Sequence, residues 1–328
     1  MKIILFILKK LPEELAHSLA LSGLNILYKL KILPLFINKI EHEEFIFLGM
    51  SFKNKLGTAA GLDKNGDYIN SLGSLGFGFL EVGTVTPLPQ SGNEKPRLFR
   101  IFDEKAIINR MGFNNKGVDH LVNNLNNINY DGVIGVNIGA NKASEGQERI
   151  NDYLFCFKKV YKLADYIVIN ISSPNTPSLR ELHNEDNLSE LLRQIATLSR
   201  ELKNTKPIFL KVSPDESDTA IERIVNEVKR FNFSGLISTN TTVDKKLLKN
   251  SKYHNYDGGL SGAPLFIKSN DTIKKIRSMD KKLPLIGVGG VISKKDFSNK
   301  LDCGANLVQI YTGFIIKGPS IVSEILEK

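Results

Sequence analysis

Residues 285–313 read LIGVGGVISKKDFSNKLDCGANLVQIYTG, and this stretch contains the pattern that decides the fold. Two short apolar runs, Leu285–Val288 and Leu307–Ile310, flank a polar segment of helical length, Lys294–Leu301. A strand, a helix and a second strand in this order are typical of a parallel sheet covered by helices. The sequence therefore predicts one strand–helix–strand unit here.

The same alternation extends toward the N-terminus as far as residue 56. The eight expected strands are Leu56–Ala60, Phe79–Val82, Val133–Ile138, Tyr166–Ile171, Ile208–Val212, Gly235–Thr239, Leu285–Val288 and Leu307–Ile310. The expected helices are Gly66–Leu75, Lys116–Asn127, Gln147–Leu163, Asp186–Leu202, Asp218–Phe231, Leu265–Ser278, Lys294–Leu301 and a last one from Pro319. Eight strands that are each followed by a helix predict an α/β fold, the (β/α)₈ TIM barrel.

Length and composition agree with a single barrel. The chain has 328 residues, of which 41% are hydrophobic and 24% charged, as in ordinary globular proteins. Cys156 and Cys303 are too few and too far apart for a disulfide framework or a zinc site, so we expect no metal and a reducing cytoplasmic compartment. The net charge of +9 indicates an anionic partner, but the lysines are scattered and no nucleic-acid-binding motif occurs, so we expect no nucleic acid.

Residues 1–45 precede the predicted strands as a helical extension, which leaves 46–328 for the barrel. The residues that recur near helical spacing on one face are Leu15, Leu19, Gly23, Leu27 and Leu30. No run of about 18 apolar residues predicts a spanning helix, and no small-residue cleavage site marks a signal peptide. Two interpretations remain open: the helices cap the barrel bottom, or their apolar side lies in the headgroup region while lysines meet anionic lipid.

Polar residues gather where the predicted strands end. They are Asp63, Lys64, Thr84, Asn137, Asn170 to Asn175, Lys211, Thr239 to Thr241, Gly289, Gly290, Tyr311 and Thr312. In a (β/α)₈ barrel these positions surround one open mouth, where the catalytic groups lie. The long connections Thr86–Asn115 and Asn240–Pro264 follow the same strand ends and are expected to carry function.

Two kinds of residue at this mouth indicate an anionic ligand. Gly289 and Gly290 follow the seventh strand and Tyr311-Thr312-Gly313 the eighth, where barrels bind phosphate through backbone N–H groups. Lys64 and Lys211 could stabilise an anionic ring or a carboxylate. Solvated surface lysines and a Schiff-base lysine remain alternatives.

The stretch Asn170–Pro177 reads NISSPNTP and offers carboxamides that match a planar polar ring such as a pyrimidine. Ser173 has no histidine beside it in the sequence, which argues against a Ser-His-Asp hydrolase. A serine that accepts a proton must pass it onward, and Thr176 is near enough in sequence to act as that relay.

Several segments together resemble the class 2 dihydroorotate dehydrogenase family, the quinone-dependent and membrane-associated class. They are Ala60–Lys64, Glu81–Thr86, Asn109–Asn115, Asn170–Arg180, Asn240–Thr242 and Gln309–Phe314. Their order and spacing are specific, and the likeness runs from about Gly49 to Lys317 and includes the N-terminal extension.

This resemblance implies that the barrel mouth holds FMN beside dihydroorotate. The implied cofactor-binding residues are Ala60, Gly61, Leu62, Asp63, Lys64, Thr84, Asn137, Asn170, Lys211, Thr239, Gly262, Gly290, Tyr311 and Thr312. The implied substrate-binding residues are Lys64, Asn109, Arg110, Met111, Gly112, Phe113, Asn170, Asn175, Asn240 and Thr241. Ser173 stands at the family's base position, where serine rather than cysteine indicates class 2.

The implied reaction is oxidation of dihydroorotate to orotate in pyrimidine biosynthesis, with Ser173 removing the C5 proton while hydride passes from C6 to FMN. A quinone then reoxidises the flavin, and His17 and Arg100 match positions that line the family's quinone tunnel. The resemblance also implies a monomer, attached through residues 1–45 to the cytoplasmic side of a bacterial inner membrane as a peripheral protein.

Other classes remain as alternatives. A soluble class 1 enzyme that uses fumarate or NAD is disfavoured by Ser173 and by the extension. A phosphosugar isomerase or a Schiff-base aldolase could use the same barrel, and a membrane-bound scaffold would not be an enzyme. A yellow protein that dihydroorotate bleaches would indicate one of the two dihydroorotate dehydrogenase classes. A phosphosugar isomerase, a Schiff-base aldolase or a scaffold would not show this.

Overall fold

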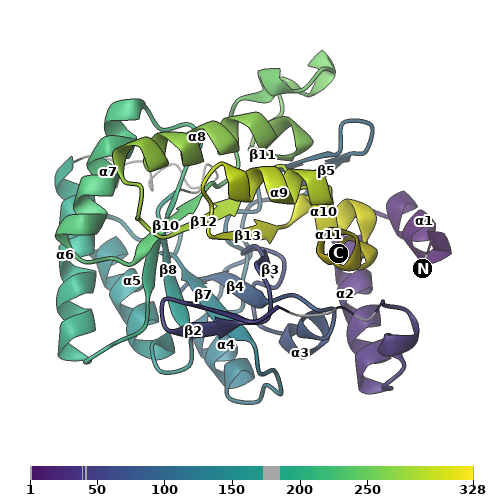
Figure 1. Cartoon of the computed structure of the whole chain (residues 1–328), viewed down its shortest axis with the longest axis horizontal. Helices are drawn as coiled ribbons and strands as arrows, with labels where there is room; N and C mark the ends of the chain where they lie inside the picture. Colours follow the sequence, from purple (N-terminus) through teal and green to yellow (C-terminus); the bar gives the residue numbers. More distant parts are fainter. Residues whose placement is uncertain (1, 39, 41–42, 173–184, 328) are drawn as a thin grey trace.

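The structure is a computed structural model that describes residues 2–38, 40, 43–172 and 185–327. Eight parallel strands close into a barrel, which confirms the predicted fold (Figure 1). In barrel order they are β3 (Leu56–Thr58), β4 (Phe79–Val85), β7 (Val133–Ile138), β8 (Tyr166–Asn170), β9 (Ile208–Val212), β10 (Gly235–Ser238), β12 (Leu285–Val288) and β13 (Leu307–Ile310). Strand β13 pairs with β3 and closes the ring.

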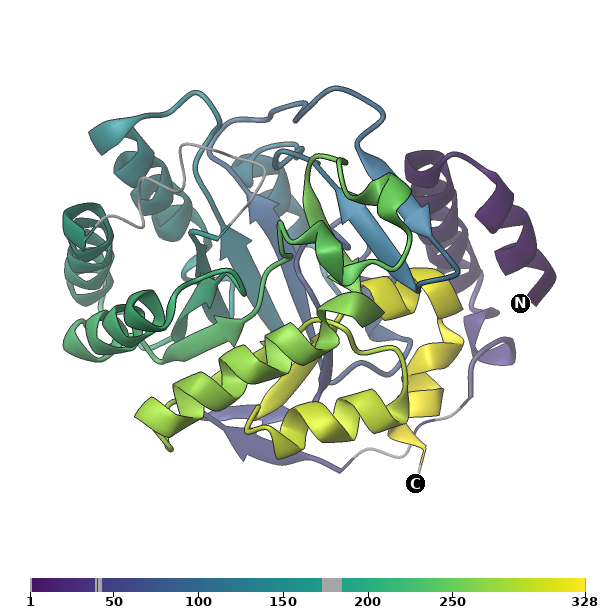
Figure 2. The ribbon, with the colours of Figure 1, turned by 90° about the horizontal axis from the view of Figure 1, so that it is seen from above.

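Helices surround the barrel (Figure 2). In chain order they are α3 (Ile69–Gly73), α4 (Val118–Leu125), α5 (Gly146–Val160), α6 (Glu185–Glu201), α7 (Asp218–Arg230), α8 (Phe266–Met279), α9 (Lys294–Asp302), α10 (Thr312–Lys317) and α11 (Ser320–Leu326). The helix expected from Pro319 begins one residue later, with Pro319 as its N-cap. Helix α10 was not among the predicted helices.

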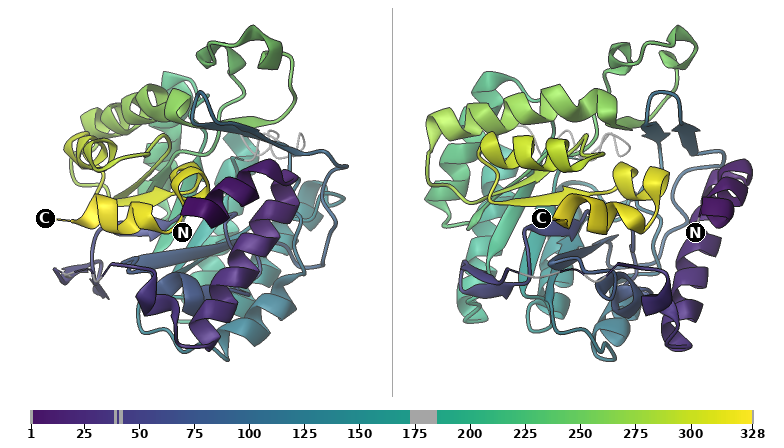
Figure 3. Two further views of the ribbon diagram at one scale, coloured as in Figure 1. Left: turned by 90° about the vertical axis from the view of Figure 1, so that its right-hand side faces the viewer. Right: turned by 45° about the vertical axis from the view of Figure 1, so that its right-hand side comes forward.

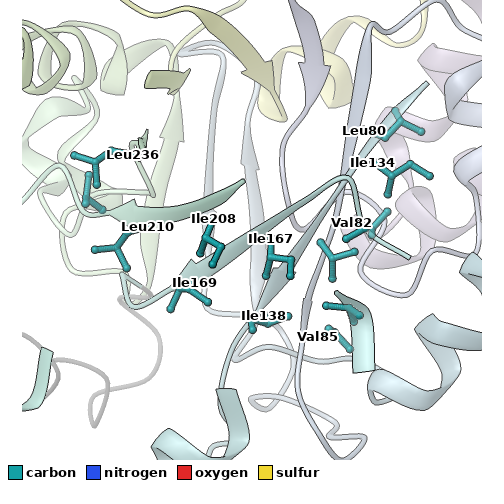
Figure 4. Packing of buried hydrophobic residues seen from close by; sticks show 14 of the residues in the cluster. Leu80, Val82, Val85, Ile134, Ile138, Ile167, Ile169, Ile208, Leu210 and Leu236 are labelled. Carbon is teal, nitrogen blue, oxygen red and sulfur yellow. The ribbon is translucent and has the colours of Figure 1, made fainter. Parts of the chain in front are cut away.

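Hydrophobic side chains fill both sides of the strands, which is why the strands read as continuous apolar runs. Inside the barrel, the rings of Phe79, Tyr166 and Phe209 meet edge to face, with centroids 5.6–6.5 Å apart. Outside, aliphatic residues of the strands face the helices. Those labelled in Figure 4 are Leu80, Val82, Val85, Ile134, Ile138, Ile167, Ile169, Ile208, Leu210 and Leu236.

A short hairpin closes the amino-terminal end of the barrel. Strands β1 (Phe45–Phe47) and β2 (Met50–Phe52) pair antiparallel, and Phe52 is fully buried against Phe79, with ring centroids 5.6 Å apart. Helices α1 (Lys2–Lys10) and α2 (Glu13–Lys29) instead lie beside the barrel, where α2 contacts α3 and a strand near the mouth (Figure 3). Of the two interpretations of the N-terminal helices, a simple cap on the barrel bottom therefore does not describe them.

The two long connections meet in a second sheet. Strands β5 (Leu98–Ile101) and β6 (Ala106–Asn109) come from the first connection, and β11 (Gly259–Gly262) from the second. They form an antiparallel sheet in the order β11-β6-β5 above one side of the barrel mouth (Figure 2). This sheet holds Asn109 and Gly262 at the edge of the mouth.

Candidate functional site

A cavity opens at the carboxyl ends of the barrel strands, and most of the predicted site residues line it. Those that do are Ala60, Gly61, Lys64, Thr84, Asn109, Met111, Gly112, Phe113, Asn170, Lys211, Thr239, Asn240, Thr241, Gly262, Gly290, Tyr311 and Thr312. They come from the ends of seven barrel strands and from both long connections. The arrangement gathers lysines, carboxamides and glycines around one space.

Four predicted residues lie elsewhere. Leu62 faces a second cavity, and Asn137 is buried beneath the first. Asp63 is buried and accepts hydrogen bonds from the backbone N–H groups of Asp67 and Tyr68, which fixes the turn that carries Lys64. Arg110 points outward, with Nη1 3.7 Å from a carboxylate oxygen of Asp257. Three more, Ser173, Asn175 and Thr176, lie outside the described residues.

A buried carboxylate lies under the floor of the cavity. Glu81 on β4 is inaccessible to solvent and accepts hydrogen bonds from Asn137 at 2.9 Å, Gln309 at 2.5 Å and Tyr166 at 3.2 Å. Its Oε1 lies 4.0 Å from Nζ of Lys211. Sequence reasoning missed Glu81, although a lone carboxylate inside an apolar strand is a signal for a buried partner.

The hydrogen bonds continue from Glu81 to the wall of the cavity. Asn137 accepts from the Thr84 hydroxyl at 2.7 Å, and Thr84 accepts from Asn170 at 3.0 Å. This chain fixes the orientation of each carboxamide, since an amide nitrogen and oxygen differ in what they can bind. Asn170 is thereby held at the cavity wall with its position set from below.

Two ammonium groups face the cavity. Lys211 is 5% exposed, and among the described side chains its charged neighbour is Glu81. Burial lowers the pKa of Lys211, and Glu81 opposes that shift. Burial, together with the nearby charge of Arg97, lowers the pKa of Lys64 to about 8. An anionic ligand in the cavity would stabilise the charged form of both ammonium groups.

At one end of the cavity, glycine turns allow a ligand to approach the backbone closely. Gly262, Gly289 and Gly290 have φ values of +96°, +119° and +79°, in the left-handed region that favours glycine. A Cβ on Gly290 would lie 2.4 Å from Cα of Phe266, at the start of α8. These turns and the N-terminus of α8 present backbone N–H groups, which suit a phosphate.

A second, largely apolar cavity lies between α2 and the barrel. Its wall includes the predicted tunnel residues His17 and Arg100, with Leu62 and Phe314. His17 Nε2 lies 3.1 Å from the carbonyl oxygen of Leu62, and burial lowers the pKa of His17 to about 4, which keeps the ring neutral. Arg100 donates to the carbonyls of Leu8 and Leu11 and so ties the end of α1 to β5.

The two cavities share their dividing wall. The turn after β3 places Gly61 and Lys64 in the mouth cavity and Leu62 in the apolar one. The segment after β13 does the same with Tyr311, which faces the mouth, and Phe314, which faces α2. A ligand in either cavity therefore contacts the same two short segments.

Helices α1 and α2 expose large apolar residues, two of which, Leu19 and Ile26, also line the apolar cavity. Those between 48% and 62% exposed are Phe6, Ile7, Leu15, Leu19, Ile26 and Leu30. No helix in the described part of the chain is long and apolar enough to cross a membrane. Exposed apolar surface of this kind is typical of sites that contact a partner or a membrane.

Comparisons with known proteins agree with this geometry. The profile of the dihydroorotate dehydrogenase family matches residues 44–328. A protein of Vibrio cholerae serotype O1 named dihydroorotate dehydrogenase (quinone) is 46% identical over 323 residues, which cover 97% of this chain and 96% of that protein. One of the same name from Buchnera aphidicola is 48% identical over 321 residues, covering 96% and 95%.

Solved structures give the same result. The crystal structure of DHODH from Eimeria tenella in complex with ferulenol superposes with a TM-score of 0.86 at 32% identity and covers 96% of this chain and 89% of that one. The ligand-free form from the same organism gives a TM-score of 0.85 at 31% identity, with 94% and 92% covered.

Proposed function

Since this chain belongs to the dihydroorotate dehydrogenase family, we propose that its mouth cavity holds FMN beside dihydroorotate and that the apolar cavity under α2 admits the quinone. The chain is a flavin-dependent oxidoreductase that oxidises dihydroorotate in pyrimidine biosynthesis with a quinone as electron acceptor. The observation that carries the proposal is the shared wall, because it brings both cavities to the same two segments.

The residues of the mouth cavity fit FMN. The molecule has a phosphate at one end and a ring that becomes anionic on reduction at the other. Glycine turns and the start of α8 supply N–H groups at one end of the cavity, while Lys64 and Lys211 supply positive charge at the other. When bound, FMN accepts a hydride. Thr84, Asn170 and Thr239 would contact the ring and ribityl chain between these ends.

Dihydroorotate would occupy the side of the cavity that faces the second sheet. Asn109, Met111, Gly112 and Phe113 line this side, together with Asn240 and Thr241. Asn240 donates to the Ser172 hydroxyl at 3.1 Å, and that hydroxyl donates to Asn170 at 3.1 Å. The carboxamides can therefore bind the pyrimidine ring while Lys64 meets its carboxylate. Ser173, with Thr176 as relay, stays our prediction for the base.

The identity of the cofactor has a direct test. We expect the purified protein to be yellow and to release FMN, in a ratio near one per chain, when it is denatured by heat. Chromatography of the released flavin beside FMN, FAD and riboflavin standards distinguishes the three. Release of FAD or riboflavin, or a colourless protein that takes up no added FMN, would contradict the proposal.

If the quinone enters through the apolar cavity, a single substitution that fills this cavity should block its entry. Gly23 of α2 lines this cavity, and a Cβ added there would meet no atom within 4 Å. In Gly23→Phe the ring should therefore fill the cavity without disturbing α2. We expect the KM for a long-chain quinone to rise at least tenfold, whereas flavin reduction by dihydroorotate changes less than twofold.

Ser18→Phe is the matched control for this variant, because Ser18 is an exposed residue of the same helix that does not line the cavity. It should leave both half-reactions unchanged. If Gly23→Phe reacted with the quinone like the wild type, the cavity under α2 would not be the entry route.

The exposed apolar residues of α1 and α2 support membrane attachment through residues 1–45. Lys9, Lys10, Lys29 and Lys31 accompany them and would meet anionic headgroups while the apolar side chains enter the interface. The protein would then lie as a monomer on the cytoplasmic side of a bacterial inner membrane. Residues 46–328 would form the catalytic barrel beside it.

A further inference from the structure

Lys300 is a buried lysine outside the cavities described above. Its side chain is 0% exposed, on the last turn of α9. Nζ donates to Oγ of Ser269 at 3.0 Å and to Oδ1 of Asn270 at 2.7 Å, both neutral acceptors on α8. Among the residues that the structure describes, no carboxylate lies within 4.0 Å of this ammonium group. A buried charge without a counter-ion is costly, so its place needs a physical reason.

The position of Lys300 suggests that reason, because the ammonium group lies directly behind the glycine turns of the mouth cavity. Its partner Ser269 lies against Gly289, where an added Cβ would be 3.0 Å from the Ser269 hydroxyl. Nζ also lies 5.3 Å from the ring centroid of Phe266, whose backbone packs on Gly290. One layer of side chains therefore separates the charge from the turns that present backbone N–H groups to the cavity.

The groups around Lys300 compensate its charge only in part. From α8 it meets Ser269, Asn270 and Phe266, and from β12 its stem packs on Gly287, so neither element places a titratable group against it. The titratable groups that act on it are Cys303 and Asp296, and Asp296 is engaged by Ser293 and the N–H of Ile292. An anion in the cavity would be the missing counter-charge.

We propose that Lys300 is a positioning residue for the flavin phosphate, which it stabilises by its charge from behind the glycine turns, through Ser269 and without direct contact. This inference rests on the proposed function, because it needs a phosphorylated flavin at that end of the cavity. Burial lowers the pKa of Lys300 to about 7, and a bound phosphate dianion would raise the pKa again. Binding of FMN near pH 8 therefore takes up a proton.

Exchange of the bound flavin tests this directly. The holoenzyme is equilibrated with mixtures of FMN and riboflavin, and the ratio of the two bound flavins is measured by chromatography after gel filtration. Riboflavin has the same ring without the phosphate, so Lys64 and Lys211 act on both flavins alike. We expect Lys300→Met to lower the preference for FMN roughly tenfold, the effect of one buried charge at intermediate distance.

Lys295→Met is the matched control, because Lys295 is an exposed residue of the same helix. It should keep the wild-type preference. If Lys300→Met weakened the binding of both flavins equally, or changed the preference less than twofold, the inference would be overturned. Lys300 would then have only a packing role.

A second arm uses only the wild type and so stands even if Lys300→Met does not fold. Between pH 7 and 9 the phosphate is already a dianion, and Lys300 loses its proton in the protein that lacks a phosphate ligand. The preference for FMN should therefore fall by about tenfold across this range. A flat profile would overturn the inference with FMN still bound, whereas a wild type that holds neither flavin would contradict the proposed function itself.

Discussion

Replacing Ser173 with alanine is expected to slow reduction of the flavin by dihydroorotate about 10²- to 10⁴-fold, the usual contribution of a general base. The variant keeps the size of the site and removes only the oxygen that would accept the C5 proton. Ser173 follows β8 directly after Ser172, whose hydroxyl lies in the hydrogen-bonded set of Asn170 and Asn240 at the cavity wall. Anaerobic stopped-flow absorbance in the flavin band measures the rate.

The FMN content and the Kd for orotate should stay within about threefold of the wild type, because neither depends on proton transfer. Ser189→Ala provides a control in which a hydroxyl on α6 loses a hydrogen bond to Glu227 far from the cavity. Flavin reduction in Ser173→Ala at half the wild-type rate or faster would remove Ser173 as the base. The proton acceptor would then have to be sought among the other residues at the mouth.

Replacing Glu81 with glutamine is expected to cost about 3 kcal/mol or more in the free energy of unfolding. The amide has nearly the shape of the carboxylate, but it turns an NH₂ group toward donors on Asn137, Gln309 or Tyr166. It also leaves Lys211 buried without the negative charge that lies 4.0 Å away. Urea unfolding followed by circular dichroism measures the loss.

Two further variants separate the charge pair from packing. Glu222→Gln makes the same change at an exposed position of α7 and should alter stability by less than about 0.5 kcal/mol. Combining Glu81→Gln with Lys211→Met should recover part of the loss, since the double variant no longer buries a lone cation. A loss below 1 kcal/mol in Glu81→Gln alone would contradict the role of Glu81 as counter-ion.

The sequence predicted the barrel because its strands are buried on both faces and so appear as uninterrupted apolar runs. Residues 133–138 and 208–212, for example, became β7 and β9 with unchanged bounds. The prediction of short helices was less accurate. The segment expected to be helical from Gly66 to Leu75 is helical only at Ile69–Gly73. The β5–β6–β11 sheet was missed. Strands β5 and β6 are neighbours in the sequence, but β11 lies about 150 residues after them, and no local pattern encodes that pairing.

The rule that function gathers at strand ends located most of the mouth cavity. It could not distinguish a residue that faces the cavity from one that supports it. Asp63 lies in the turn after β3 and Asn137 near the end of β7. The first fixes that turn, and the second links Glu81 to Thr84 by hydrogen bonds. Glu81 and Lys300 were missed for a related reason, because their roles depend on buried neighbours that are distant in the sequence.

One anaerobic experiment tests the central claim, that flavin, dihydroorotate and quinone meet at one shared wall. Dihydroorotate is added to the purified yellow protein in the absence of oxygen, and a long-chain quinone follows. We expect the flavin band to bleach when dihydroorotate is mixed in and to return in full when the quinone is added. A band that dihydroorotate leaves unchanged, or one that bleaches but does not return with any quinone, would contradict it.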